Sequence, residues 1–327
     1  MQSPRKQARL QQADAPRQGR RLSLATREAI WAYIFLAIPL VFFLGLRIYP
    51  AFQSFWLSMF TWHVNPAQRN FVGADFYREM LQNPRLHQAL RNTLQYMVIT
   101  VPLQLLLGLG IAMLLQQVQL FKGLFRAIYF APFVTPAVGV AWVWSWMYSF
   151  NHGIINTMLI EWSLFWEGVG ITWLSIAPQR FLGSPQQALY SVAAVVIWQN
   201  LGFQVVIFLA GLQGVPRMFY EAARIDGASG FRLFRHITLP LLNPVMVFSV
   251  VISTISALQL FDQVVNINFA DQGGPLGSTL TIALHIYQEA FGRSRFGYAS
   301  AVTVLLFVII LTVTLLQLRL FSRKVEY

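Results

Sequence analysis

Cysteine is absent from the 327 residues, and charged side chains make up only 11% of them. The first absence excludes disulfides, thiol catalysis and thiolate metal sites. The second is far below the roughly 25% of charged residues that soluble domains carry, and 56% of the chain is hydrophobic. A chain this poor in charge stays dispersed only where lipid covers its apolar exterior, so the composition indicates a membrane protein.

Motifs of several enzyme classes are missing as well. A phosphate-binding loop needs a Gly-Lys pair followed by Ser or Thr, and none of the lysines (Lys6, Lys122 and Lys324) follows a glycine. The five histidines show no metal-ligand spacing, and no Gly-x-Ser-x-Gly motif occurs. The sequence therefore predicts a chain that is not an enzyme by itself, with no catalytic residue and no metal site.

Long apolar stretches without charge are what the sequence does contain. A membrane-spanning helix needs about 20 apolar residues, and the six stretches that qualify are 29–46, 92–121, 127–160, 181–216, 236–261 and 296–318. The third and fourth exceed one crossing, so each includes some loop, and the third helix is expected to open with Pro132 and Pro136. We interpret 48–68 as the outer end of the first helix, followed by an interfacial belt of Trp56, Phe60 and Trp62.

Basic residues are distributed unevenly, and their distribution predicts the orientation of the chain. With a cytoplasmic N-terminus, the inside segments hold 16 of the 24 Lys and Arg residues; these segments are 1–28, 117–126, 213–240 and the tail from Arg319. With acidic residues included, they carry a net charge of +11 and the remainder +1. Such charge faces anionic lipid and requires no nucleic-acid partner. Both termini are therefore expected in the cytoplasm.

The remaining segments divide into a tail, a transmembrane domain and its connections. Residues 1–28 are rich in Gln and Arg, so we expect a disordered basic cytoplasmic tail, followed by the transmembrane domain at 29–327. The basic-then-apolar start differs from a cleaved signal peptide, since the apolar run is too long and no small-x-small site follows. External segments are expected at 69–91, 150–188 and 266–295.

The loop at 214–244 is the most informative segment. Pro216 suits the first turn of a helix, on which Met218, Ala222 and Ile225 would share one face. This compact feature would present an apolar face outside the membrane with no lipid to cover it. Such a face usually docks on another protein.

The same loop contains a predicted break between two helices. Gly227 can adopt the left-handed conformation that ends a helix, and Asp226 or Ser229 can cap a second short helix. Pro240 and Pro244 would then start the next span. The sequence therefore predicts a helix–turn–helix that projects from the membrane.

This loop resembles the EAA loop in permease subunits of bacterial ATP-binding-cassette (ABC) importers. The matching positions are Glu221, Ala222, Ala223, Asp226, Gly227, Ala228, Phe234, Ile237, Leu239, Pro240, Leu242 and Pro244. Other stretches are similar to the carbohydrate-uptake branch, the maltose and glycerol-3-phosphate permeases: 49–50, 71–77, 92–93, 126–132, 210–213, 273–275 and 296–301. The resemblance covers residues 30 to 320, although the approach to Gly273 departs from the usual pattern.

The resemblance implies an all-α membrane protein with six transmembrane helices, the type I ABC importer permease (MetI-like) fold, in the bacterial inner membrane. It implies a heterodimer with a second permease subunit, two ATPase subunits and an external solute-binding protein. ATP and Mg²⁺ would be bound by the ATPase subunits, and no cofactor by this chain. ATPase coupling would fall to Glu221, Ala222, Ala223, Asp226, Gly227, Ala228, Phe234 and Pro240, with Glu221 anchoring by charge-assisted bonding.

Polar residues inside two spans are candidates for the substrate path, because buried polar side chains in a membrane usually serve a purpose. They are Gln199, Asn200 and Gln204 in the fourth span, beside Gly202 and Phe203, and Gln259, Asp262 and Gln263 at the end of the fifth, beside Phe261. Amides suit hydroxyl groups, and aromatic faces can stack on sugar rings. No Lys or Arg lies centrally in a span, so we expect a neutral sugar, oligosaccharide or polyol. The alternative role of each amide is to join helices by hydrogen bonds.

Two other functions are compatible with a polytopic membrane protein. An ion-coupled secondary transporter would show inverted repeats and intramembrane carboxylates, and Asp262 is the one acidic residue suited to that role. A membrane sensor or scaffold would transport nothing. ATP-dependent solute uptake in proteoliposomes separates these from an importer.

Overall fold

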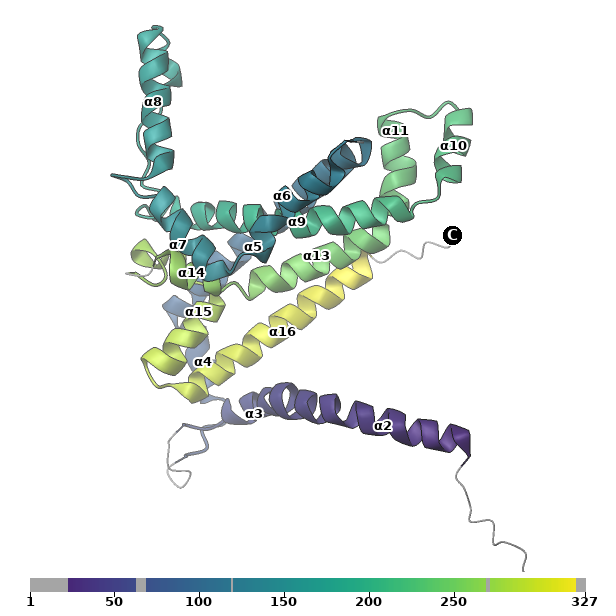
Figure 1. The fold of residues 1–327 in the computed structure, drawn as a ribbon. Coiled ribbons are helices and arrows are strands. Elements are labelled where there is room, and N and C mark those ends of the chain that lie inside the picture. Colours follow the sequence, from purple (N-terminus) through teal and green to yellow (C-terminus); the bar gives the residue numbers. More distant parts are fainter. Residues whose placement is uncertain (1–22, 63–68, 119, 269–270, 322–327) are drawn as a thin grey trace, which may run out of the picture. The chain divides into compact units, whose positions relative to one another are not determined.

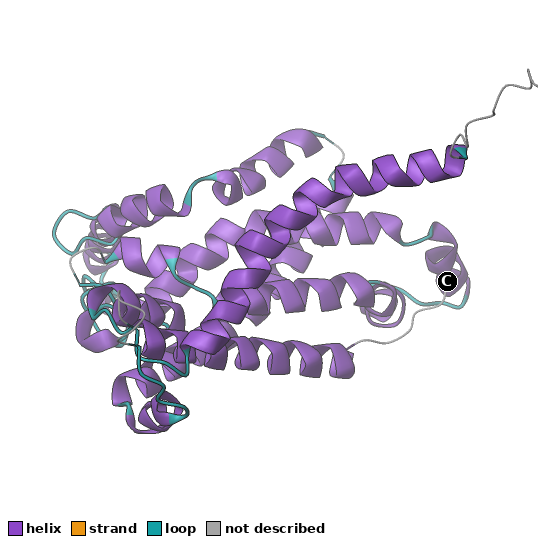
Figure 2. Ribbon diagram, turned by 90° about the horizontal axis from the view of Figure 1, so that it is seen from below, coloured by secondary structure: helices purple, strands orange, loops and turns teal. Residues whose placement is uncertain are grey.

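The computed structural model describes residues 23–62, 69–118, 120–268 and 271–321. Contacts within the chain divide it into two compact units, Met1–Gln53 and Ser54–Tyr327. The described ranges are helical (Figure 2), and strand-like pairing within them is limited to one bridge between Phe60 and Phe71. Most of the predicted tail lies outside the described residues.

The N-terminal unit contains α2 (Leu24–Phe43), η1 (Leu44–Ile48) and the beginning of α3 (Tyr49–Leu57). Ser23 caps α2, since its side-chain oxygen accepts a hydrogen bond from the backbone N–H of Thr26 at 3.2 Å. The helical run Leu24–Leu57 is long and apolar enough to cross a membrane. It confirms the first predicted span and its continuation beyond Ile48.

The second unit contains all the other spans and their connections. Its elements are α4 (Asp75–Gln82), α5 (Pro84–Gln117), α6 (Lys122–Val134), α7 (Ala137–Met147), α8 (Ile154–Gly168), η3 (Thr172–Leu174), α9 (Ala188–Gly214), α10 (Arg217–Ile225), α11 (Phe231–Leu233), η4 (Phe234–Thr238), α12 (Leu239–Leu241), α13 (Asn243–Leu258), α14 (Asp262–Ile267), η5 (Pro275–Gly277), α15 (Ile282–Tyr287), η6 (Gln288–Gly292) and α16 (Phe296–Phe321). Helix α9 packs along α5, α6 and α13 (Figure 1) and is the most deeply buried of the long apolar helices.

Four of the predicted spans are unbroken helices, and two are bent. The pair α6 and α7 is bent by 94°, and the pair formed by Phe231–Leu241 and α13 by 69°. Counting each bent pair as one span gives six within the described residues. The predicted all-α fold with six transmembrane segments is confirmed.

The bend between α6 and α7 corrects the prediction that the third helix opens with Pro132 and Pro136. Helix α6 already begins at Lys122 and includes Pro132. Thr135 is extended, with ψ 133°, and Pro136 caps α7. The ring of a proline excludes the preceding residue from the helical region, so the break falls at Thr135.

Segments that the sequence suggested as external loops contain further helices. Within 150–188, α8 is held by the chain that returns along it: the Asn156 side chain accepts from the Gln179 N–H at 2.8 Å and donates to the Gln179 carbonyl at 3.0 Å. The segment 69–91 contains α4 and the first turns of α5, and 266–295 contains α15 and η6. Length alone did not distinguish loops from short helices that satisfy their backbone groups locally.

An ion cluster joins α4 to the base of α16. Arg295 donates to both carboxylate oxygens of Glu79 at 2.6 Å. Its other guanidinium nitrogen lies 3.4 Å from Glu289, which is 1% exposed and also pairs with Arg293. His285 is buried beside this cluster. Burial first, and the positive charge of the nearby arginines second, lower the pKa of His285 to about 4 and keep the imidazole neutral.

Replacing Glu289 should destabilise the second unit. Within the described residues, the substitution Glu289→Gln leaves Arg293 without an acidic partner and Arg295 with Glu79 alone, and we expect the free energy of unfolding to fall by about 2 kcal/mol, because charge-assisted hydrogen bonds to a buried carboxylate are lost. The matched control is Asp75→Asn, which breaks a pair whose side chains are 67% and 80% exposed and should cost less than about 1 kcal/mol. Thermal unfolding followed by tryptophan fluorescence compares them, and equal effects would contradict a structural role for the cluster.

Candidate functional site

A helical hairpin follows α9, at the position of the predicted coupling loop (Figure 1). Pro216 is extended and caps α10, which ends at Ile225. Gly227 then adopts φ +77°, the left-handed conformation that glycine adopts without penalty. This part of the predicted helix–turn–helix is therefore present.

The second arm begins later than the sequence suggested. Its N-cap is Gly230, with φ +47°, and no side chain caps it; the prediction that Asp226 or Ser229 caps this helix is wrong. A second positive-φ glycine turns the chain before either side chain can reach the new helix. Pro240 lies inside the continuous run Phe231–Leu241, so it does not start the next span; α13 begins at Asn243, with Pro244 in its first turn.

The surface of the hairpin suits a docking partner. Met218 is 67% exposed and Ile225 is 86% exposed, and Ala222 between them is exposed too. Tyr220 and Thr238 join the two arms by a hydrogen bond between their hydroxyls at 3.1 Å. The predicted apolar face of α10 is therefore uncovered on a hairpin that is internally braced. Of the other predicted coupling residues, Glu221, Asp226 and Gly227 are exposed, whereas Ala223, Ala228 and Phe234 are half-buried.

A cavity of about 430 Å³ lies between α5, α6, α9 and α13. Seven of the nine predicted path residues line it: Asn200, Phe203, Gln204, Gln259, Phe261, Asp262 and Gln263. Its remaining polar walls are Tyr96, Thr100, Gln104, Ser253 and Ser256, which sequence reasoning missed. Tyr96, Thr100 and Gln104 recur every four residues in a charge-free span, and this polar stripe on one face of α5 was the available signal.

Gln199 and Gly202 do not line the cavity but hold its walls together. The Gln199 side chain donates to the Thr135 carbonyl at 3.2 Å and accepts from the Gln263 amide at 3.1 Å. A methyl group added at Gly202 would lie 2.0 Å from the carbonyl oxygen of Tyr129. Both residues therefore join the segments around the cavity, and close helix packing requires a glycine at Gly202.

The chemistry of the cavity is that of hydrogen bonding and ring stacking. Gln204 donates to the Ser253 hydroxyl at 2.6 Å, and its buried Oε1 has no partner within the described residues. The rings of Phe133 and Phe203 are stacked with centroids 5.0 Å apart. Asp262 is the one charged residue of the lining. This set offers donors, acceptors and aromatic faces to a neutral, hydroxyl-rich solute.

Comparison with known proteins gives a consistent set of relatives. Residues 104–327 match the family "Binding-protein-dependent transport system inner membrane component". The trehalose/maltose transport system permease protein MalF of Thermococcus litoralis is 31% identical over 90% of this chain and 95% of its own length. The diacetylchitobiose uptake system permease protein NgcF of Streptomyces coelicolor is 34% identical over 88% of this chain and 81% of its own.

A solved structure shares the fold over almost the whole chain. It is a bacterial ABC transporter involved in the import of the acidic polysaccharide alginate, with a TM-score of 0.75 and 20% identity. The match covers 92% of this chain and 98% of that one.

Adding a single methyl group to Gly202 should show whether this residue serves helix packing or contact with the solute. We expect Gly202→Ala to force α9 away from α6, to lower the free energy of unfolding by about 3 kcal/mol and to reduce the yield of folded protein. The control Gly110→Ala, where nothing lies within 4 Å of the added carbon, should behave like the natural chain. Normal unfolding with altered uptake in Gly202→Ala would show instead that Gly202 contacts the solute.

Proposed function

This chain belongs to the family of binding-protein-dependent transport system inner membrane components, and we propose that, as the permease subunit of an ABC importer, it moves a neutral oligosaccharide or polyol. An ion-coupled secondary transporter is set aside by this membership. The observation that carries the proposal is a cavity lined by amide, hydroxyl and aromatic groups. Helix α9 forms one wall of this cavity, and the coupling loop follows directly after α9.

The charge of the cavity supports a neutral solute. The alginate importer carries an acidic polysaccharide, so this fold by itself does not select neutral cargo. Here no Lys or Arg lines the cavity, and Asp262 lines it. A carboxylate at that place repels an anionic solute, whereas the amides of Asn200 and Gln204 can both donate to hydroxyl groups and accept from them.

Helix α9 supplies the link between the cavity and ATP hydrolysis. Its middle carries Asn200 and Gln204, and it ends at Gly214, three residues before Arg217, where the hairpin helix α10 begins. We take residues 214–244 as the coupling loop that sits on an ATPase subunit. Closure of two ATPase subunits around ATP would draw two such loops together and tilt α9, which opens the cavity to the outside.

Partners and placement follow from the same proposal. The chain lies in the bacterial inner membrane as a multi-pass protein with both termini in the cytoplasm, where its basic charge faces anionic lipid. It pairs with a second, different permease subunit, two ATPase subunits that bind ATP and Mg²⁺, and an external solute-binding protein. A solved relative of this fold is complexed with a periplasmic protein that binds an alginate pentasaccharide, which supports the last of these partners.

The turn of the coupling loop gives a test with a built-in control. Gly227 has φ +77° and open space around it, so only backbone strain opposes a side chain there. Gly227→Val should strain the turn by about 2 kcal/mol and uncouple ATP hydrolysis from uptake, whereas Gly227→Asn should be tolerated, since Asn visits this conformation. The ratio of solute transported to ATP hydrolysed in proteoliposomes measures this. Full coupling in Gly227→Val would argue against the proposed role of the turn.

The class of solute is tested on the external binding protein and on the cavity. Mass spectrometry of the solute that the binding protein retains should identify an uncharged carbohydrate; a uronate or phosphate ester would overturn the charge argument and leave the importer assignment intact.

In the permease, Asp262→Asn should raise uptake of an acidic analogue by about fivefold, because it removes one like-charge contact. Asp271→Asn, an acidic residue outside this cavity, serves as its control.

A further inference from the structure

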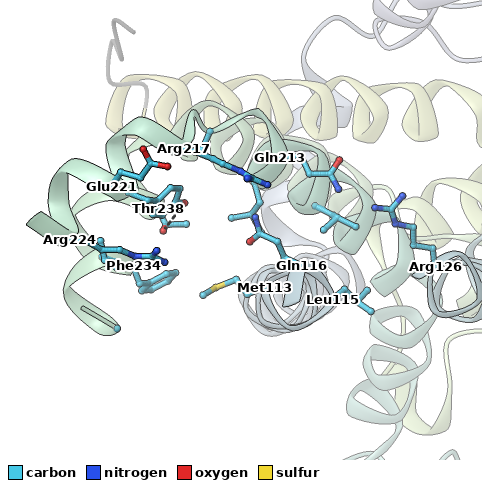
Figure 3. Close-up of a pocket in the computed structure, with 16 residues that line it drawn as sticks. Met113, Leu115, Gln116, Arg126, Gln213, Arg217, Glu221, Arg224, Phe234 and Thr238 are labelled. Carbon is cyan, nitrogen blue, oxygen red and sulfur yellow. Dashed lines mark hydrogen bonds between the residues drawn. The ribbon is translucent and has the colours of Figure 1, made fainter. Parts of the chain in front are cut away.

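A second cavity, of about 730 Å³, lies behind the coupling loop (Figure 3). Its walls come from the last turns of α5 and α9, from the first turns of α6, and from the hairpin formed by α10 and the run Phe231–Leu241. It is separate from the proposed solute path, with which it shares no lining residue. The proposed transport mechanism gives it no role.

This cavity has an apolar floor and a cationic rim. Leu115, Leu209 and Leu212 are buried at its base. Arg126 from α6, and Arg217 from α10, reach towards Gln213 from opposite sides (Figure 3). A ligand that fits both parts has an apolar portion and a negatively charged head.

In the described part of the chain, the arginines of the rim outnumber the acidic residues that line the cavity with them. Arg126, Arg217 and Arg224 make no ion pair and no side-chain hydrogen bond within the described residues, and Glu221 is the one acidic residue of the lining. Three guanidinium groups around one hollow repel each other. A bound anion removes that cost, and guanidinium groups suit phosphate because they donate two parallel hydrogen bonds to it.

The location of the cavity indicates the source of the phosphate. Helices α5 and α9 end beside it, and α6 begins beside it, so it lies where the spans leave the membrane and lipid headgroups are found. Exposed apolar side chains lie on the same helical turns as lining residues of the cavity: Leu114 of α5 is 65% exposed and Leu124 of α6 is 57% exposed. They point away from Leu115 and Arg126 around their helices, so the turns that line the cavity also carry surface that suits lipid.

We propose that this cavity binds the phosphate headgroup of an anionic phospholipid, with the glycerol and upper acyl chain on the leucine floor. The site goes beyond the transport function. Because α10 forms one wall, bound lipid would also hold the coupling loop at a fixed distance from α9; this consequence alone rests on the proposed coupling role.

The test uses the intact importer, with both permease and ATPase subunits, in phosphatidylcholine nanodiscs to which phosphatidylglycerol is added. Native mass spectrometry should find phosphatidylglycerol retained by the natural chain. In Arg126→Gln combined with Arg217→Gln, its apparent affinity should fall by about tenfold or more, because two charge-assisted contacts are lost. Arg126→Lys should lose less binding than the double variant, because lysine keeps the positive charge and binds phosphate as a point charge, although it gives up the paired hydrogen bonds. Arg319→Gln, at an exposed basic residue in the last turn of α16 outside the cavity, should change nothing.

The other outcomes are equally definite. Unchanged lipid retention in the double variant would overturn the site. Loss of ATPase subunits from the double variant, with lipid retention intact, would assign these arginines to a protein contact instead. If inorganic phosphate competed with phosphatidylglycerol at millimolar concentration and bound as well in its absence, the occupant would be a free anion and the lipid assignment would fall. Native mass spectrometry measures bound lipid without any transport activity. The lipid site can therefore be confirmed or overturned even if the proposed transport function proves wrong.

Discussion

Close packing of α9 against its neighbours is the constraint on which both the cavity and the coupling loop depend. In a membrane, helices approach closely where small residues meet, and three glycines mark such contacts here. A methyl group at Gly108 of α5 would lie 2.6 Å from Gln204, one at Gly202 would lie 2.0 Å from a backbone carbonyl of α6, and one at Gly211 would lie 2.8 Å from Leu242 beside α13. These contacts fix α9 on three sides and leave room for a cavity between its middle turns and α13.

In the proposed mechanism, the same packing lets a change at one end of α9 reach the other. Helix α9 has no proline, whereas α5 and α6 contain Pro102 and Pro132, so it is better suited than either of these neighbours to move as a rigid rod. Its middle turns present Gln204 to the cavity, and its last turn leads through Pro216 into the hairpin. The buried bond from Gln204 to Ser253 joins this rod to α13, the span that follows the hairpin. Both helices that leave the coupling loop therefore form walls of the cavity.

Much of this architecture could be predicted from the sequence, and the failures have physical causes. Charge-free length predicted the spans, and Pro216 at a helix start followed by Gly227 at a helix end predicted the hairpin with its left-handed glycine. Composition could not predict the break at Thr135, because a proline near a helix start and one at a bend give the same pattern. Seven residues chosen as path candidates, on α9 and in the segment after α13, line one cavity. The contribution of α5 to that cavity, with Tyr96 and Gln104, depends on which helices become neighbours and could not be predicted. Gly202 looked like part of the path until its contact with the Tyr129 carbonyl was known.

The central claim is that the exposed face of α10 docks on an ATPase subunit. The absence of cysteine makes a direct measurement clean, since a single introduced cysteine is the only thiol of this chain. Ile225→Cys, at a position that is 86% exposed, would carry a thiol-attached photo-cross-linker in the assembled importer. Trp173→Cys, at an exposed position in the segment after α8, would carry the same probe as a control. The account predicts that light joins the Ile225 probe to an ATPase subunit and that the Trp173 probe captures none. Capture of lipid alone at Ile225, with the importer intact and active, would contradict it.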